Sequence, residues 1–481
     1  MAAMHELDHK LGNRIAELVR STGVPGYVAG IHHDGSQTLA AHGFANTATR
    51  LPMTVDTGFL FGSVTKVLTT TLLMRHVEDG QINLDERVTA YLPGFRLATP
   101  GHAEELRVRN LLNHTSGIDA DILGPSRVNG VDAMKTYVET LAQCGSIFDV
   151  NQYASYSNPG FVLAGRLLEV VTGNSFADLL DQELFGPVGM TGTCASAERA
   201  PRSRTAVGHF AEPGTSRPRP TGMFALPASI AAAGSTPIGT VADLLAFGRT
   251  HLADGVAPSG TRVLARELAR LMQTMTHDMT TPSMPPVGLG WWLMPFGQTV
   301  GLFHGGGSPG GTSALLVVPD QGFVFAAYGN GPAAASLHDR LILWLLRDHL
   351  SLDVPETPAG PSAARSLRVY EGTYLSHQVR TELRAAGEGL VRTVAYEPID
   401  DDHARMLARF FSGGTVLPVE TTVMVPVGGG LFTPAGQQPP VPVGPWGRLS
   451  VMSFHDWDGE RPGFVGHHLR LQPRTSKPVS G

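Results

Sequence analysis

Ser63-Val64-Thr65-Lys66 is the stretch whose residue types and spacing are best suited to chemistry. It follows the apolar run 59–62 and precedes residues 67–76, where leucines recur at helical spacing. We therefore expect Ser63 at a helix start, with the Lys66 amine on the same face and next to the serine hydroxyl. An amine whose pKa is lowered by burial can take the hydroxyl proton and make the serine a nucleophile. The N–H of Ser63 would itself be a candidate oxyanion donor, because N–H groups at a helix start are unpaired.

Two motifs further along the chain carry groups that could act with this serine and lysine. Tyr156-Ser157-Asn158 offers a phenol and an amide in a turn closed by Pro159-Gly160, and His304-Gly305-Gly306 lies in a glycine-rich stretch. A tyrosine can act as a general base when a neighbouring ammonium lowers its pKa. Because S-x-x-K occurs by chance in most long chains, the three motifs together are stronger evidence than the first alone. The sequence leaves open which of Lys66 and Tyr156 holds the proton at rest.

With these motifs the chain resembles the serine β-lactamase and penicillin-binding-protein superfamily, in particular its class C β-lactamase-like branch of esterases, D-aminopeptidases and transacylases. The resemblance covers roughly residues 8–350, and residues 78–93 and 108–117 match further stretches of the superfamily. It implies that Ser63 is the nucleophile and that Lys66 and Tyr156 are general bases. For His114, within 108–117, we expect a structural hydrogen bond to backbone rather than chemistry.

The resemblance also implies which groups bind the substrate. Asn158 is expected to hydrogen-bond Lys66 and the acyl amide, Gly305 and Gly306 to open a strand edge to the substrate, and the Gly307 N–H to be the second oxyanion donor. His304 stands where β-lactamases usually carry a lysine, and a histidine is only partly protonated near neutral pH. This replacement argues against β-lactamase and carboxypeptidase activity, whereas esterase, D-aminopeptidase and transacylase relatives tolerate histidine at this position.

The expected fold class is α/β (α+β): a β-lactamase-like antiparallel sheet flanked by helices, an all-α subdomain, and a small C-terminal β-barrel that resembles a lipocalin. The predicted boundaries are residues 1–350 for the hydrolase domain, 351–365 for a Pro-rich linker, 366–474 for the barrel and 475–481 for a tail. Periodicity and turn signals predict the elements of the first domain. They are helices at 7–21, 67–76, 88–93, 161–172, 176–184, 240–247 and 336–349, and strands at 27–31, 38–44, 288–293, 301–304, 313–318 and 323–328.

Three other regions have weaker signals. Residues 119–150 show little regular pattern and are expected to cap the cleft, and residues 200–235 read as a surface excursion near it. In the barrel, short β-like runs at 370–374, 383–385, 390–395, 421–427 and 464–471 contain no catalytic constellation. His467 and His468 are adjacent, so on a strand they would face opposite ways and could not jointly bind a metal.

Composition excludes several classes of protein. The chain has 481 residues, 42% of them hydrophobic and 16% charged, with a net charge of −6 and no run of Lys or Arg, which argues against nucleic-acid and membrane binding. Its two cysteines, Cys144 and Cys194, are expected to be reduced and buried. No secretory signal and no apolar run of membrane-spanning length is visible, so a cytoplasmic location is expected.

Together these features predict a serine acyl-enzyme hydrolase or acyltransferase without a cofactor or metal. It most resembles the penicillin-binding-protein-type thioesterases, which transfer a peptidyl group from a (thio)ester to an amine and so cyclise nonribosomal peptides. The alternatives are a biosynthetic transacylase, a D-aminopeptidase or carboxylesterase, and, least favoured, a catalytically silent ligand sensor. The expected partner is a small-molecule or peptidyl (thio)ester, with a carrier protein as a candidate. The sequence names neither acyl donor nor acceptor, nor the oligomeric state.

Overall fold

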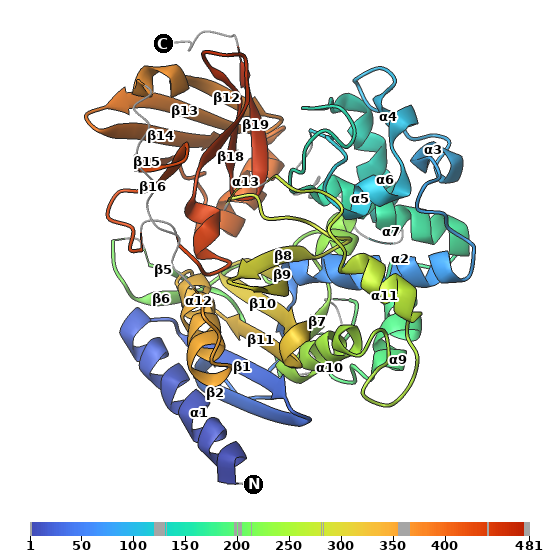
Figure 1. Ribbon diagram of the computed structural model, residues 1–481, viewed down its shortest axis with the longest axis vertical. Coiled ribbons are helices and arrows are strands. Elements are labelled where there is room, and N and C mark those ends of the chain that lie inside the picture. Colours follow the sequence, from blue (N-terminus) through green and yellow to red (C-terminus); the bar gives the residue numbers. More distant parts are fainter. Residues whose placement is uncertain are drawn as a thin grey trace.

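The computed structural model contains two large antiparallel sheets, one built from strands within residues 26–329 and the other from strands within residues 372–475 (Figure 1). It describes residues 2–119, 130, 132–196, 200, 204–212, 214–279, 281, 283–354, 366–439 and 442–475. The predicted linker, apart from residues 351–354, lies outside these ranges. Within them, no helix combines the length and apolar character needed to cross a bilayer.

The first sheet has seven strands in the order β3-β2-β1-β11-β10-β9-β8, so that β1, near the start of the chain, pairs with β11, where Tyr27 lies opposite Gly329. The two predicted early strands are present and form a hairpin across Asp34-Gly35, and the predicted late strands are present too, although the first of them begins at Trp292 rather than at 288. The strands are β1 Gly26–His33, β2 Ser36–Asn46, β3 Leu51–Pro52, β8 Trp292–Phe296, β9 Thr299–Ser308, β10 Gly311–Val318 and β11 Phe323–Gly329.

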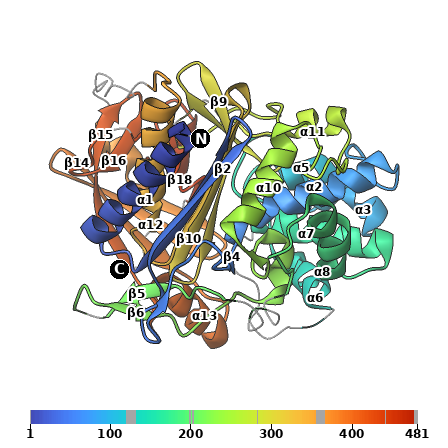
Figure 2. The same cartoon turned by 90° about the horizontal axis from the view of Figure 1, so that it is seen from below.

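Helices cover both faces of this sheet (Figure 2). On one face, α1 (Ala2–Thr22) and α12 (Ala334–Trp344) pack against alternate strand residues such as Ala29. On the other face, α10 (Val241–Leu252) packs against Val28 and its neighbours. Each face therefore receives every second side chain, as the period of a β-strand requires.

A helical subdomain lies beside the sheet, as predicted. Its helix α7 (Asn158–Thr172) is capped at both ends: the Ser157 hydroxyl accepts the Gly160 N–H, and Gly173 has a φ of 72°. The other helices are α2 Thr65–Glu78, α3 Val88–Tyr91, α4 His102–Glu105, α5 Val108–Leu112, α6 Ala133–Thr140, α8 Phe176–Leu179, α9 Gly186–Val188 and α11 Arg266–Met272.

Two expectations for this region are wrong. Residues 133–140, expected to lack regular structure, form α6, which contributes Met134 and Tyr137 to the main core; residues 120–129 of the same stretch lie outside the described ranges. Within 200–235, the turn η5 (Ala228–Ala233) is buried rather than superficial, and its residues border the cleft. Neither cysteine forms a disulfide, as predicted, and Cys144 is buried whereas Cys194 is only half-buried.

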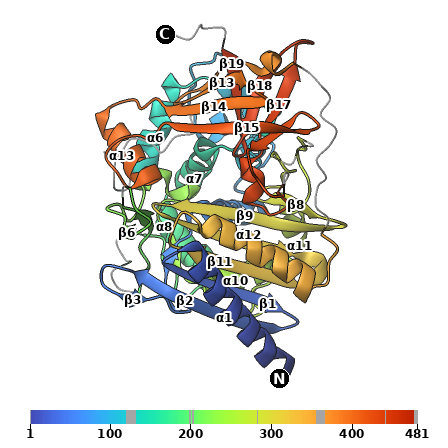
Figure 3. The same ribbon diagram turned by 90° about the vertical axis from the view of Figure 1, so that its left-hand side faces the viewer.

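The second sheet is a nearly closed antiparallel barrel of eight strands, in the order β16-β15-β14-β13-β12-β19-β18-β17 (Figure 3). A bridge between Phe432 and Met452 links its two ends. The strands are β12 Gly372–Ser376, β13 Val379–Ala386, β14 Gly389–Tyr396, β15 Glu420–Gly428, β16 Leu431–Pro434, β17 Ser453–Trp457, β18 Pro462–His467 and β19 Arg470–Thr475. Thr475, expected in the tail, thus belongs to the barrel.

The barrel also carries a helix that the sequence analysis missed, α13 (Asp401–Ser412). Its signals were present in the sequence, because the Asp400 carboxylate caps the start by accepting the His403 N–H and Gly413 ends the helix with a φ of 64°. The apolar face of α13 turns toward the cleft, where Leu407, Phe410 and Phe411 line the cavity.

A carboxylate on α12 holds the barrel against the first sheet. Asp339 accepts the backbone N–H groups of Trp446 (2.9 Å) and Gly447 (2.6 Å), and the Trp446 ring stacks on His338 with centroids 5.9 Å apart. Burial raises the pKa of Asp339 to about 7, against these hydrogen bonds and the charge of Arg448. Asp339 therefore joins the two parts of the chain directly.

We predict that Asp339→Ala destabilises the folded protein, because it leaves two N–H groups at the junction without an acceptor. Each buried donor left unpaired costs about 1–3 kcal/mol. Denaturant unfolding of Asp339→Ala should show a lower midpoint than that of the wild type. The midpoint of Asp339→Asn, which keeps one acceptor oxygen, should lie between those of Asp339→Ala and the wild type. An unfolding midpoint of Asp339→Ala equal to that of the wild type would contradict this role.

Candidate active site

Ser63 lies in a 3₁₀ turn (Gly62–Val64) that runs directly into α2, as the sequence predicts. Gly62, with a φ of 56°, packs against the motif strand β9: a Cβ at this position would lie 2.6 Å from the Gly307 oxygen and 2.9 Å from its nitrogen. Only a glycine therefore fits between the nucleophile turn and β9. This close approach places the Gly307 backbone beside Ser63.

The Lys66 amine is fully buried and lies between three oxygen atoms. Nζ donates to Asn158 Oδ1 (2.7 Å) and to the Ala233 carbonyl (2.7 Å), and it lies 3.3 Å from Ser63 Oγ. Burial, and then the charge of Arg470, holds the Lys66 pKa well below its usual value. A neutral amine has two hydrogens and one lone pair, so its two donor contacts leave the lone pair for the Ser63 hydroxyl. The geometry thus suits Lys66 to accept the serine proton.

Tyr156 occupies the position just before α7 and is enclosed on several sides. Lys66 Nζ lies 4.7 Å and the Arg470 guanidinium 4.5 Å from the centre of its ring, and its N–H donates to the Leu469 carbonyl at 2.7 Å. Burial raises the Tyr156 pKa, while a hydrogen bond with Ser63 lowers it by a smaller amount. Burial therefore favours the neutral form of both the phenol and the neighbouring amine.

His114 has the structural role that the sequence predicts. Its Nδ1 accepts the Ser157 N–H at 3.1 Å, and its ring stacks with the rings of Tyr156 (centroids 4.8 Å apart) and Trp292 (5.1 Å). Burial, and then the charge of Lys66, lowers the His114 pKa well below its usual range, so the ring is neutral. It orients Tyr156 by packing.

His304 on β9 differs from its expected state. The side chain is 1% exposed, and its Nδ1–H donates to the Gly305 carbonyl at 2.8 Å. Burial, and then the charge of Lys66, lowers the His304 pKa to about 3, so the expected partial positive charge near neutral pH is wrong. The position held by lysine in β-lactamases thus carries a neutral ring.

The glycines that follow His304 are needed for packing. A Cβ at Gly306 would lie 2.1 Å from the Phe61 oxygen, and one at Gly305 would lie 2.6 Å from the Trp446 ring. The strand that carries Gly307 is therefore tightly held between the nucleophile turn and the barrel. The structure brings together all the predicted site residues: Ser63, Lys66, Tyr156, Asn158, His304, Gly305, Gly306 and Gly307.

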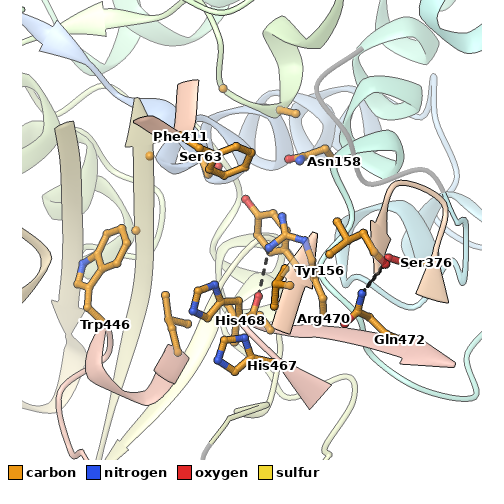
Figure 4. Close-up of a pocket in the computed structure, with 18 of the residues that line it drawn as sticks. Ser63, Tyr156, Asn158, Ser376, Phe411, Trp446, His467, His468, Arg470 and Gln472 are labelled. Atoms are coloured by element: carbon orange, nitrogen blue, oxygen red, sulfur yellow. Dashed lines mark hydrogen bonds between the residues drawn. The ribbon is translucent and has the colours of Figure 1, made fainter. Parts of the chain in front are cut away.

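A cavity of about 460 Å³ opens on Ser63 and extends between the two sheets (Figure 4). Residues far apart in the sequence form its walls. The first domain contributes Ser63, Tyr156, Asn158, Trp292, His304 and Gly307, and the barrel contributes Ser376, Arg392, Phe410, Phe411, Trp446, His467, His468, Arg470 and Gln472. The barrel is thus part of the site, although the sequence analysis found no catalytic constellation in it.

The turn between β18 and β19 explains part of the reason why the sequence analysis did not place barrel residues in the site. His468 and Leu469 have φ values of 50° and 63°, in the left-handed region, so the second imidazole turns back and stacks on His467 with centroids 4.0 Å apart. The expectation that the two rings face opposite ways is therefore wrong. The same turn directs Arg470 onto Tyr156, and the sequence contained no signal for this contact. Within the described ranges, no group of three or more His, Cys, Asp and Glu side chains could hold a metal ion.

The comparisons with known proteins agree with this geometry. The model of the Beta-lactamase family matches residues 11–347, so the chain belongs to this family of serine hydrolases and acyltransferases. Penicillin-binding protein 4 of Amycolatopsis lactamdurans is 38% identical over 73% of this chain and 93% of that protein. D-aminopeptidase of Brucella anthropi is 33% identical over 34% of this chain and 32% of its own length.

Two solved structures show how far the fold is shared. SurE superposes with a TM-score of 0.75 over 97% of this chain and 99% of its own, at 24% identity, so the two-part architecture is common to both. D-amino acid amidase from Ochrobactrum anthropi SV3 has a TM-score of 0.58 and 27% identity, over 67% of this chain and 91% of its own.

Proposed function

We propose that this protein is a peptidyl transferase that cyclises its substrate: Ser63 takes a peptidyl group from a thioester and passes it to an amine of the same peptide. The proposal rests on one observation, namely that residues of the barrel pack over Tyr156. Arg470 of the barrel stacks on the phenol ring and the Leu469 carbonyl accepts the Tyr156 backbone N–H, so the group that receives the acyl chain reaches Ser63 through the cavity between the two parts of the chain. A site that served water alone would not need such an enclosed acceptor space.

The first half of the reaction uses the groups around Ser63. Lys66 accepts the hydroxyl proton as Oγ attacks the thioester carbonyl, and the N–H groups of Ser63 and Gly307 stabilise the oxyanion. When the carbonyl reforms, the bond to sulfur breaks and the departing thiolate takes a proton from Lys66 through Tyr156. The product of this step is an ester on Ser63, with both bases neutral again.

In the second half an amine replaces the departed thiol. Tyr156 and Lys66 remove its proton as it attacks the ester, and Ser63 recovers its hydrogen when the amide forms. Class A β-lactamases use a glutamate to activate water. Among the described residues that line this cavity, the one with a carboxylate is Glu420, which lies on the barrel strand β15. An amine held in place has an advantage over water, since effective molarities reach roughly 10⁵ M or more.

The relatives support a D-residue at the end of the acyl donor. The D-aminopeptidase and the D-amino acid amidase are named for D-configured substrates, and the amidase, at 27% identity, has been solved with D-phenylalanine. We propose that the residue attached to the thioester is D-configured. A carrier protein in the cytoplasm would present it.

The same relatives favour a second candidate, the hydrolysis of D-amino acid amides or peptides, with the wider alternatives of an esterase or a biosynthetic transacylase. These activities share every step up to the ester on Ser63. They differ only in the group that removes the acyl chain.

We predict that a peptidyl thioester with a free N-terminal amine and a D-residue at its C-terminus gives mainly cyclic peptide. Acetylating the amine should divert the reaction to slow hydrolysis or leave the peptide on Ser63, because the bound acceptor is lost. Liquid chromatography with mass spectrometry separates cyclic, linear and enzyme-bound peptide, and a matched L-residue substrate tests the configuration. Similar hydrolysis of free and acetylated substrates without cyclic product would select the hydrolase.

A further inference from the structure

Arg392 is a buried cation at the barrel end of the active-site cavity. It lies on β14, is 6% exposed, and lines the cavity. Its Nη1 donates to His467 Nδ1 at 2.7 Å, and its buried Nε has no hydrogen-bond partner. Among the described residues no carboxylate lies within ion-pairing distance of it, although the charge of Glu420 acts on it from farther away.

The hydrogen-bond partner of Arg392 does not balance its charge. Burial, and then the neighbouring charges of His468 and Arg392, holds the His467 pKa well below its usual range, so the ring is neutral. His468, enclosed by the cavity walls, has its pKa lowered to about 4 and is neutral as well. A buried charge normally has a partner of opposite sign, because desolvation without one costs free energy. Arg392 is therefore a buried cation with no carboxylate paired directly to it among the described residues and with an Nε that has no hydrogen-bond partner.

The cavity as a whole is cationic, although the chain carries a net charge of −6. Arg392, Arg448 and Arg470 line it, against the single carboxylate of Glu420 among the described lining residues. Arg448 has a structural role, since it donates hydrogen bonds to the carbonyls of Val443 and Pro295. Arg470 stacks on Tyr156. Arg392 is thus the arginine placed to meet a ligand away from the reacting atoms.

We propose that the barrel end of the cavity is an anion subsite in which Arg392 binds a phosphate or carboxylate of the substrate. This deepens the proposed function and rests on it. Two sources share this chemistry: the phosphate of a phosphopantetheine arm that carries the thioester, and a carboxylate side chain of the peptide. A guanidinium suits both, because its planar N–H groups match the oxygens of either anion.

The test measures how ligands protect Ser63 from a fluorophosphonate, which requires no turnover. Two matched pairs of competitors are compared: pantetheine 4′-phosphate with pantetheine, and a D-terminated peptide amide containing Glu with the same peptide containing Gln. In the wild type, the anionic member of one pair should protect at roughly 10- to 100-fold lower concentration than its neutral partner. The pair that shows this difference identifies the source of the anion.

The variants assign the effect to one side chain. Arg392→Met should remove the difference and Arg392→Lys should retain part of it, whereas Arg384→Met, which removes an exposed arginine of the same barrel, should leave it unchanged. Equal protection within both pairs in the wild type, or a difference that persists in Arg392→Met, would overturn the subsite. Failure of the cyclisation experiment with this difference intact would remove the transferase function and leave the anion subsite standing.

Discussion

Replacing Ser63 with alanine should abolish covalent labelling by a fluorophosphonate and reduce thioester turnover by about 10⁴-fold or more. Ser63 is the serine whose Oγ lies 3.3 Å from a buried amine and beside the backbone of Gly307. Removing the oxygen removes the covalent intermediate, while the cavity and the hydrogen bonds of Lys66 to Asn158 and Ala233 remain. Intact-protein mass spectrometry should show one adduct on the wild type and none on the variant.

Ser376 provides the matched control, because it faces the same cavity without a basic amine beside it. Its Oγ receives a hydrogen bond from Gln472 instead. Ser376→Ala should label like the wild type, with the adduct on the peptide that contains Ser63. An adduct on any other serine, or persistent labelling of Ser63→Ala, would show that the nucleophile has been misassigned.

The parts of the site that sequence could predict are those fixed by local geometry. A spacing of three residues at a helix start places Lys66 beside Ser63 whatever surrounds them. The strands at 27–31 and 38–44 and the helix at 240–247 likewise depend on neighbouring residues, and all are present. The family motifs then supplied the distant partners, Tyr156 and the β9 glycines.

The parts that failed depend on how distant segments pack. The neutral state of His304 follows from complete burial, which its neighbours in sequence do not reveal. Arg470 reaches Tyr156 only because the barrel docks on the first domain and the residues before it adopt left-handed backbone. The sequence shows only a strand that ends in two histidines, and this pattern does not predict the left-handed turn. Helix α13 is a different case, because its capping signals were present in the sequence and were overlooked.

The second large effect concerns Lys66, the proposed base beside Ser63. Lys66→Met should reduce kcat/KM by roughly 10²- to 10⁴-fold, the usual contribution of a general base, because no described group replaces Nζ beside Ser63 Oγ. Lys135→Met, which removes an exposed lysine on α6, is the matched control and should retain activity. Loss of activity in both variants would point to a general effect of charge rather than to a base.

The pH dependence of kcat/KM should then reveal the contribution of Arg470. Lys66 must be neutral to accept the serine proton, so activity falls on the acid side as pH drops through its lowered pKa. Arg470 helps to lower that pKa by repelling the ammonium form, second only to burial. Arg470→Gln removes the repulsion, so the Lys66 pKa should rise and the acid limb should move to higher pH. Arg470→Lys keeps the charge and should leave the limb near its wild-type position. An acid limb that stays in place or moves to lower pH in Arg470→Gln would show that the barrel does not tune the base, and that Arg470 acts on the substrate alone.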